Sequence, residues 1–78
     1  MAKAVQKVQI NTSYEIAGFK GDLTLADRLK DLGFLKGNIF KVVSRAPFAG
    51  PIIVELDSIS FALRESEMDC LEVIECQN

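Results

Sequence analysis

The segment IIVELDSISFAL, residues 52–63, predicts a β-hairpin. Apolar residues alternate with other residues on both sides of Asp57 and Ser58, which is the period-2 pattern of strands that bury one face. Asp and Ser favour turns, so the two runs are expected to pair across them. The residues expected on the inward faces are Ile52, Val54 and Leu56 before the turn and Ile59, Phe61 and Leu63 after it.

Strand patterns also occur on both sides of this hairpin. Further strands are expected over residues 13–19, 38–46 and 71–76, and the last strand of the hairpin is expected to run to residue 64. In the first of these, Tyr14 and Ile16 fall on one face. Strands therefore account for most of the chain.

One helix is expected, over residues 24–32. Its apolar face consists of Leu25, Leu29 and Leu32, at positions i, i+4 and i+7. Thr24 is the expected N-cap, and Gly33 supplies the permissive residue just past the last turn.

The length of 78 residues allows one domain. Residues 1–11 are expected to form a flexible lead-in, and residues 12–78 are expected to form the folded domain. So many strands with a single helix are best satisfied by a small sheet curled on itself, which hides most of its edges. The predicted fold is mainly β with one short helix, an SH3-like small β-barrel.

The charge and the apolar runs exclude several classes of partner. Nine basic and eleven acidic residues give a formal charge of -2, so there is no excess of cations to neutralise a nucleic acid backbone. Apolar runs such as residues 52–54 are far shorter than the roughly 20 residues of a membrane-spanning helix. The first ten residues lack the apolar core of a secretory signal, and a cytoplasmic location is expected.

The supply of metal ligands is poor. The chain has no histidine, and its two cysteines, Cys70 and Cys76, are expected to be free thiols, Cys70 as a small buried residue. With nearby carboxylates they could make at most a weak or intermolecular site, whereas a durable site needs about three or four convergent ligands. We therefore expect no metal site and no cofactor. The nearby carboxylates are Glu65, Glu67, Asp69, Glu72 and Glu75.

Catalytic residues are not expected either. Without histidine, the usual base beside a Ser or Cys nucleophile is missing. The run from Gly33 to Gly37 lacks the Gly-Lys-Ser/Thr ending of a phosphate-binding loop. The protein is therefore expected not to be an enzyme.

Two surfaces are candidates for binding another protein. The loop RAPFAGP, residues 45–51, places Phe48 between two prolines where a hairpin tip should project, either as an anchor for a partner or as a lid folded back on the barrel. Leu35, in the turn after the helix, is a second candidate for an exposed contact. The predicted partner-binding residues are Leu35, Arg45, Pro47, Phe48 and Pro51.

Several marks follow one another along the chain: Leu-Gly at the end of the helix (32–33), a Gly that opens a strand (37), an Arg-x-Pro loop (45–47) followed by Pro51, and Ala-Leu-Arg at the close of a strand (62–64). With these marks the segment from residue 25 to residue 75 resembles the FeoA family, and the resemblance extends over about residues 14–75. The sequence departs from the family pattern at Lys36, where Pro is common, and at Gly50, where an acidic residue or Asn is frequent. Both positions lie in expected turns and leave the core pattern untouched. The residues that carry the resemblance are Leu32, Gly33, Gly37, Arg45, Pro47, Pro51, Ala62, Leu63 and Arg64.

The resemblance implies an SH3-like barrel that acts with FeoB, a membrane transporter of ferrous iron with a cytoplasmic GTP-binding domain. The implied function is regulation of this transporter through protein contacts, with the direction of regulation and the docking face left open. The alternative is a free-standing regulatory or self-associating domain that senses a divalent metal, since similar domains end metal-dependent transcription regulators. Pairing into a homo-oligomer through exposed strand edges also remains open.

Overall fold

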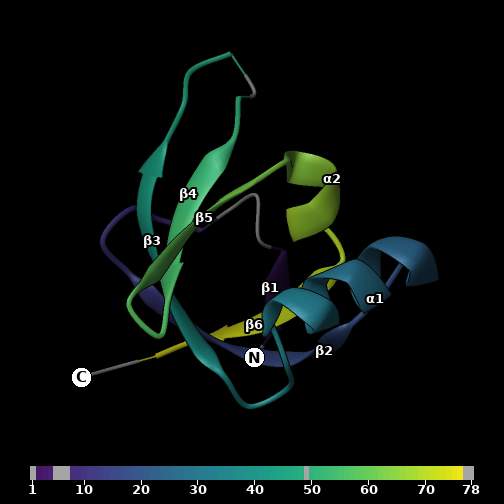
Figure 1. Ribbon diagram of the computed structural model, residues 1–78. Helices are drawn as coiled ribbons and strands as arrows, with labels where there is room; N and C mark the ends of the chain where they lie inside the picture. Colours follow the sequence, from purple (N-terminus) through teal and green to yellow (C-terminus); the bar gives the residue numbers. More distant parts are fainter. Residues whose placement is uncertain (1, 5–7, 49, 77–78) are drawn as a thin grey trace.

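The computed structural model describes residues 2–4, 8–48 and 50–76, and within these residues six strands form one antiparallel sheet. The strands lie in the order β1-β6-β2-β3-β4-β5, and the sheet curls around the core as an SH3-like small β-barrel (Figure 1). The fold class agrees with the prediction, and β1 and β5 are the two edges. The strands are β1 (Ala2–Ala4), β2 (Ser13–Phe19), β3 (Ile39–Arg45), β4 (Ile52–Leu56), β5 (Ile59–Leu63) and β6 (Leu71–Glu75).

Strands β4 and β5 form the predicted hairpin. Asp57 and Ser58 connect them, with φ angles of 51° and 67°, and positive φ at both central residues is what a type I′ two-residue turn requires. The inward residues of β4 are buried as expected. Ile59 differs from the prediction, because it begins an edge strand beside the turn and its side chain is 58% exposed.

The core contains a cluster of four aromatic rings. Phe34 lies with its ring centroid 6.1 Å from that of Phe40 and 5.1 Å from that of Phe61, edge to face in both pairs. Tyr14 lies 6.0 Å from Phe40, and its hydroxyl accepts a hydrogen bond of 2.9 Å from the main-chain N–H of Gln9. Each ring of Tyr14, Phe34 and Phe40 is almost wholly buried. The aromatic cluster thus joins β2, β3 and β5 to the segment after the helix.

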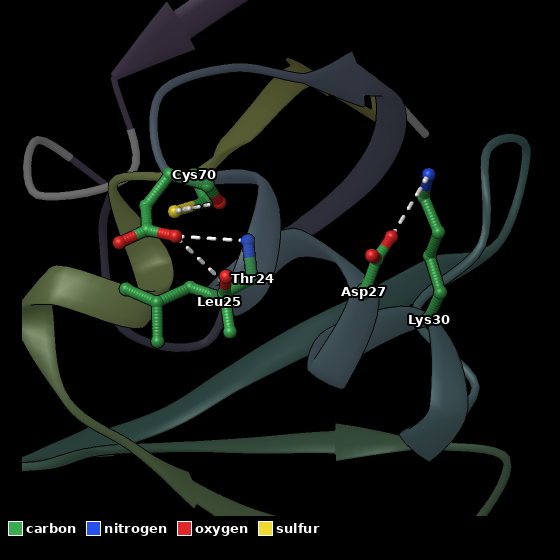
Figure 2. Close-up of polar contacts among 6 residues, drawn as sticks. Thr24, Leu25, Asp27, Lys30 and Cys70 are labelled. Carbon is green, nitrogen blue, oxygen red and sulfur yellow. Dashed lines mark hydrogen bonds and ion pairs between the residues drawn. The ribbon is translucent and has the colours of Figure 1, made fainter.

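Helix α1 (Leu23–Leu32) begins one residue earlier than expected, because its N-cap is Asp22 and not Thr24. The Oδ1 atom of Asp22 accepts hydrogen bonds from the main-chain N–H groups of Thr24 at 2.8 Å and Leu25 at 3.3 Å (Figure 2). A carboxylate at this position satisfies two otherwise unpaired donors and complements the positive end of the helix dipole. Thr24 therefore lies within the first turn of the helix, and its N–H is one of the two groups that the Asp22 side chain caps.

The end of α1 directs the next residue into the core. Gly33 adopts φ 109°, which a side chain would disfavour, and the N–H of Phe34 donates to the carbonyl of Leu29 at 3.0 Å. Leu29 is buried and Leu25 packs on the core, but Leu32 is 45% exposed, contrary to prediction. Because the chain turns at Gly33, Phe34 occupies the core position beyond Leu29 that a longer helix would have given to Leu32.

A second helix, α2 (Glu65–Met68), was not predicted. It is a single turn, too short to show helical periodicity in the sequence. The main-chain N–H of Arg64 donates to the Glu67 carboxylate at 2.8 Å, and Met68 buries its side chain in the core. No helix among the described residues combines the length and apolarity needed to cross a membrane.

The predicted lead-in over residues 1–11 differs from the structure at the residues that are described. Ala2–Ala4 form β1, which pairs with β6 in the register Lys3 opposite Val73. Val8 is buried in the core, and the N–H of Asn11 donates to the carbonyl of Val42 at 2.7 Å. The sequence does not indicate that these residues belong to the domain, because their apolar positions do not follow a clear strand pattern.

The N-cap can be tested by paired substitutions. Asp22→Ala is expected to lower the free energy of unfolding by about 0.5 to 2 kcal/mol, since the first N–H groups of α1 lose their acceptor. Thr24→Ala is expected to change it by no more than about 0.5 kcal/mol. Urea unfolding of both variants measures the difference, and a larger loss for Thr24→Ala would show that the cap is wrongly assigned.

The core role of Phe34 gives a second expectation. Phe34→Ala removes a fully buried ring and should lower the free energy of unfolding by about 3 to 5 kcal/mol. Leu35→Ala, one residue further on and half-exposed, should cost about 1 kcal/mol or less. Urea unfolding followed by circular dichroism compares the two, and similar losses would contradict the assignment of Phe34 to the core.

Candidate partner-binding surface

The β3–β4 connection forms a hairpin tip whose shape is held by main-chain hydrogen bonds. The N–H of Ala46 donates to the carbonyl of Pro51 at 3.0 Å, and the N–H of Gly50 donates to the carbonyl of Pro47 at 3.1 Å. A Cβ atom on Gly50 would lie 2.7 Å from the Cβ of Ala46, so the close approach requires glycine. The tip projects from the body of the sheet (Figure 1).

Phe48 stands free at this tip. Its side chain is 99% exposed, which contradicts the alternative that it folds back as a lid on the barrel. Its φ angle of 59° lies in the left-handed region, which costs a bulky residue about 1 kcal/mol or more. Strain and exposure of an aromatic side chain coincide here, and such a coincidence is typical of a functional position.

The structure brings four of the five predicted residues together. Arg45 ends β3, and Pro47 and Pro51 flank Phe48; all are exposed. We refer to Arg45, Pro47, Phe48 and Pro51 as the tip surface. It combines an aromatic side chain, an arginine and two prolines, and aromatic residues and arginine are enriched at protein interfaces.

Leu35 does not belong to this surface. It is 48% exposed in the turn between α1 and β3, at the opposite end of β3 from Arg45. Seven residues of strand span about 20 Å, so Leu35 and Phe48 lie at separate ends of the molecule. A partner that covers the tip surface alone would leave Leu35 uncovered.

An open hollow lies at the base of the tip surface. Its volume is about 560 Å³, and it is bounded by the start of β4, the end of β5 and the start of α2. Arg64 is exposed at the edge of the hollow, and Ala62 and Pro51 form the apolar part of its lining. The hollow extends the tip surface towards α2. Its lining residues are Gly50, Pro51, Ala62, Arg64, Glu65 and Ser66.

Other exposed apolar residues were not singled out by the sequence. On the outer face of the sheet, Ile39 and Ile74 both lie opposite Glu15, one on each neighbouring strand, and both are exposed. Leu23 is exposed at the start of α1. The alternation of β3 could have indicated that Ile39 is exposed, because Phe40 beside it must face the core. That Ile39 and Ile74 lie on either side of the same residue depends on the order of the strands in the sheet.

The cysteines occupy structural positions. Cys70 is a buried free thiol whose Sγ lies 3.5 Å from the carbonyl of Ser66. The same Sγ lies 3.8 Å from the carbonyl of Asp22 (Figure 2). Cys76 follows β6 and is a half-buried free thiol. The described residues contain no group of three or more His, Cys, Asp or Glu side chains arranged to hold a metal ion.

These observations define a small SH3-like domain that presents an apolar hairpin tip. The family model of the FeoA domain matches residues 4–75. The chain therefore belongs to the FeoA family, as the sequence resemblance indicated, and the family is associated with ferrous iron transport. The match begins ten residues before the segment in which the resemblance was seen, consistent with the placement of Val8 and Asn11 in the fold.

Solved structures with the same fold include two FeoA proteins and one longer protein. A FeoA-like protein from Clostridium acetobutylicum has a TM-score of 0.89 and 22% identity, over 99% of this chain and 90% of that one. An iron uptake regulatory protein (FeoA) has a TM-score of 0.85 and 18% identity, over 97% and 100%. A manganese-dependent transcriptional repressor has a TM-score of 0.85 and 20% identity, over 96% of this chain but 42% of its own. These structural similarities establish the fold of the chain.

The exposure of Phe48 is open to a direct test. Phe48→Ala is expected to change the free energy of unfolding by no more than about 0.5 kcal/mol, because the ring buries almost no surface. Phe40→Ala, at a buried position of the adjoining strand, should cost about 3 to 5 kcal/mol. Thermal and urea unfolding report both values, and a loss above about 2 kcal/mol for Phe48→Ala would support the lid instead.

Proposed function

We propose that this protein is a non-enzymatic accessory protein of bacterial ferrous iron uptake, which binds the cytoplasmic side of a FeoB-type transporter and regulates it. Membership in the FeoA family supports the iron uptake role. The observation that carries the binding role is Phe48, fully exposed in a strained conformation on a projecting tip. The transporter contributes the GTP-binding domain, and this protein acts on it through contact.

The tip surface has the properties of a prepared anchor. Burying a Phe side chain in a groove of the partner contributes about 1.5 to 3 kcal/mol. The hydrogen bonds between Ala46 and Pro51 and between Gly50 and Pro47 already hold the tip, so little conformational entropy is lost on binding. The two prolines reduce this loss further, because their φ angles are fixed in the free chain.

Charges beside the anchor favour an acidic rim on the partner. Arg45 ends β3 at the tip, and Arg64 lies exposed at the hollow below it. Guanidinium groups pair with carboxylates in a planar, two-point geometry. A transporter groove with an apolar floor for Phe48 and carboxylates at its margin would match this surface, and its ion pairs would raise the rate of association more than the affinity.

The anchor role predicts a specific loss of affinity. Phe48→Ala should weaken binding to the purified cytoplasmic domain of the transporter by about 1 to 3 kcal/mol, roughly 5- to 150-fold in Kd. Leu23→Ala is the matched control, because Leu23 is also strongly exposed but lies on α1, outside the tip surface. Isothermal titration calorimetry measures both affinities.

The same variants decide whether the contact regulates the transporter. GTP turnover by the cytoplasmic domain, and iron uptake in cells that carry Phe48→Ala, should both lose the effect of the wild-type protein. Leu23→Ala should retain it. Unchanged affinity of Phe48→Ala would remove the tip from the interface, and absence of binding by the wild-type protein would overturn the proposed function.

A further inference from the structure

The edge strand β5 has unpaired main-chain groups in a regular arrangement. It pairs with β4 on one side, and the sheet ends on its other side. Leu56 lies opposite Ile59 at the two-residue turn, so these residues exchange main-chain hydrogen bonds, and the bonded pairs then alternate along the hairpin. Ile59, Phe61 and Leu63 therefore bond to β4. The N–H and C=O groups of Ser60 and Ala62 point to the free edge.

Nothing within the described part of the chain uses these groups. Among the described residues, no main-chain hydrogen bond of a turn, loop or cap involves Ser60 or Ala62. The sequence of β5, ISFAL, contains no charged residue and no proline. Natural edge strands are usually protected by lysine, proline or a bulge, since an unprotected edge is a template for pairing. This edge lacks these protections, which indicates that another strand covers it.

We propose that a second copy of the chain pairs with this edge, antiparallel and β5 to β5, with the two-fold axis at Phe61. In this register Ser60 lies opposite Ala62 of the second copy, and the reverse pair is equivalent. All the outward N–H and C=O groups of both strands would then be bonded, giving four main-chain hydrogen bonds. An axis at Ser60 would also align outward groups, but it would place Ala62 opposite position 58. An axis at Ala62 would place Ser60 opposite position 64, and both of these positions lie outside the strand.

The side chains of β5 suit pairing with their own copy. Phe61 is half-buried and faces Phe61 of the second copy across the axis, and Ile59, 58% exposed, lies opposite Leu63. Aromatic and branched pairs across strands contribute favourably. Because β5 is uncharged, two copies meet without like charges in the paired strands. The pairing covers the exposed part of Ile59 and Phe61.

Arg64 at the end of each paired strand comes close to the turn of the second copy. In this register Ser58 lies opposite Arg64 of the second copy, and Asp57 lies opposite Glu65 and diagonally across from Arg64. Asp57 and Arg64 are both exposed and have opposite charge. Glu65 already belongs to α2, so the chain leaves the line of the strand after Arg64. The contact occurs twice by symmetry.

The size of the edge sets the strength of the dimer. One strand of five residues provides a small interface, well below the area of about 1,000 Å² that stable complexes exceed. A reversible, concentration-dependent dimer is therefore expected. This inference goes beyond the proposed function and does not depend on it, because it concerns the association of the isolated protein with itself. Ala62 and Arg64 also line the hollow at the base of the tip surface, so the dimer would cover part of that hollow.

Charge exchange at the edge tests the register. Ser60→Lys with Ala62→Lys places lysines directly opposite each other, and Ser60→Glu with Ala62→Glu does the same with carboxylates. Each double variant alone should remain monomeric in sedimentation velocity at concentrations where the wild-type protein dimerises. An equal mixture of the two should recover the dimer. Ser44→Lys is the control, since Ser44 is exposed on β3, and β4 separates β3 from the β5 edge.

The wild-type protein provides a second readout that requires no variant. As its concentration rises, the amide resonances of Ser60 and Ala62 should shift and become protected from exchange, while that of Phe61, already bonded to β4, should change little. A wild-type protein that stays monomeric up to millimolar concentration would overturn the proposal. So would a dimer that survives in both double variants, or a mixture that fails to pair.

Discussion

The fold depends on the burial of Phe34 between Phe40 and Phe61. A sheet of short strands in so small a domain has little core to hold its curl, and this ring fills the space between β3 and β5 from outside the sheet. The ring reaches that place because Gly33 ends α1 in a left-handed conformation. One backbone angle thus determines both where the helix stops and which side chain completes the core.

The small core also explains where the candidate functions lie. The interior is filled by a few large rings, and the tip extends beyond them. Strand β5 contributes Phe61 and Leu63 to the core but has a neighbouring strand on one side only. The tip is shaped by main-chain hydrogen bonds and a glycine at Gly50, which leave Phe48 without an intramolecular contact surface. The outward main-chain groups of β5 lie at the free edge of the sheet. The two proposed binding surfaces are thus parts of the chain that the core does not cover.

Sequence reasoning succeeded where the signal is local and failed where a neighbour decides. The alternation of β4 predicted its buried face correctly, since each residue of a central strand has a defined side. The same reasoning wrongly predicted that Ile59 and Leu32 are buried. Ile59 begins an edge strand and has no neighbouring strand to cover it, and Phe34 occupies the core position expected for Leu32. Thr24 was predicted as the N-cap, whereas Asp22 caps the helix; both residue types cap helices, and the position of the cap depends on where the chain leaves β2.

The sequence by itself determined the strands, the main helix, the β4–β5 turn and the family, because these depend on periodicity, turn chemistry and motif order along the chain. It also indicated that residues 45–51 form a candidate surface. Only the tertiary structure decided that Phe48 is exposed, that Leu35 lies at the other end of β3, and that Ala2–Ala4 join the sheet. The reason is physical: direction along a strand or helix is a local property, whereas burial depends on which distant segments arrive to cover a side chain.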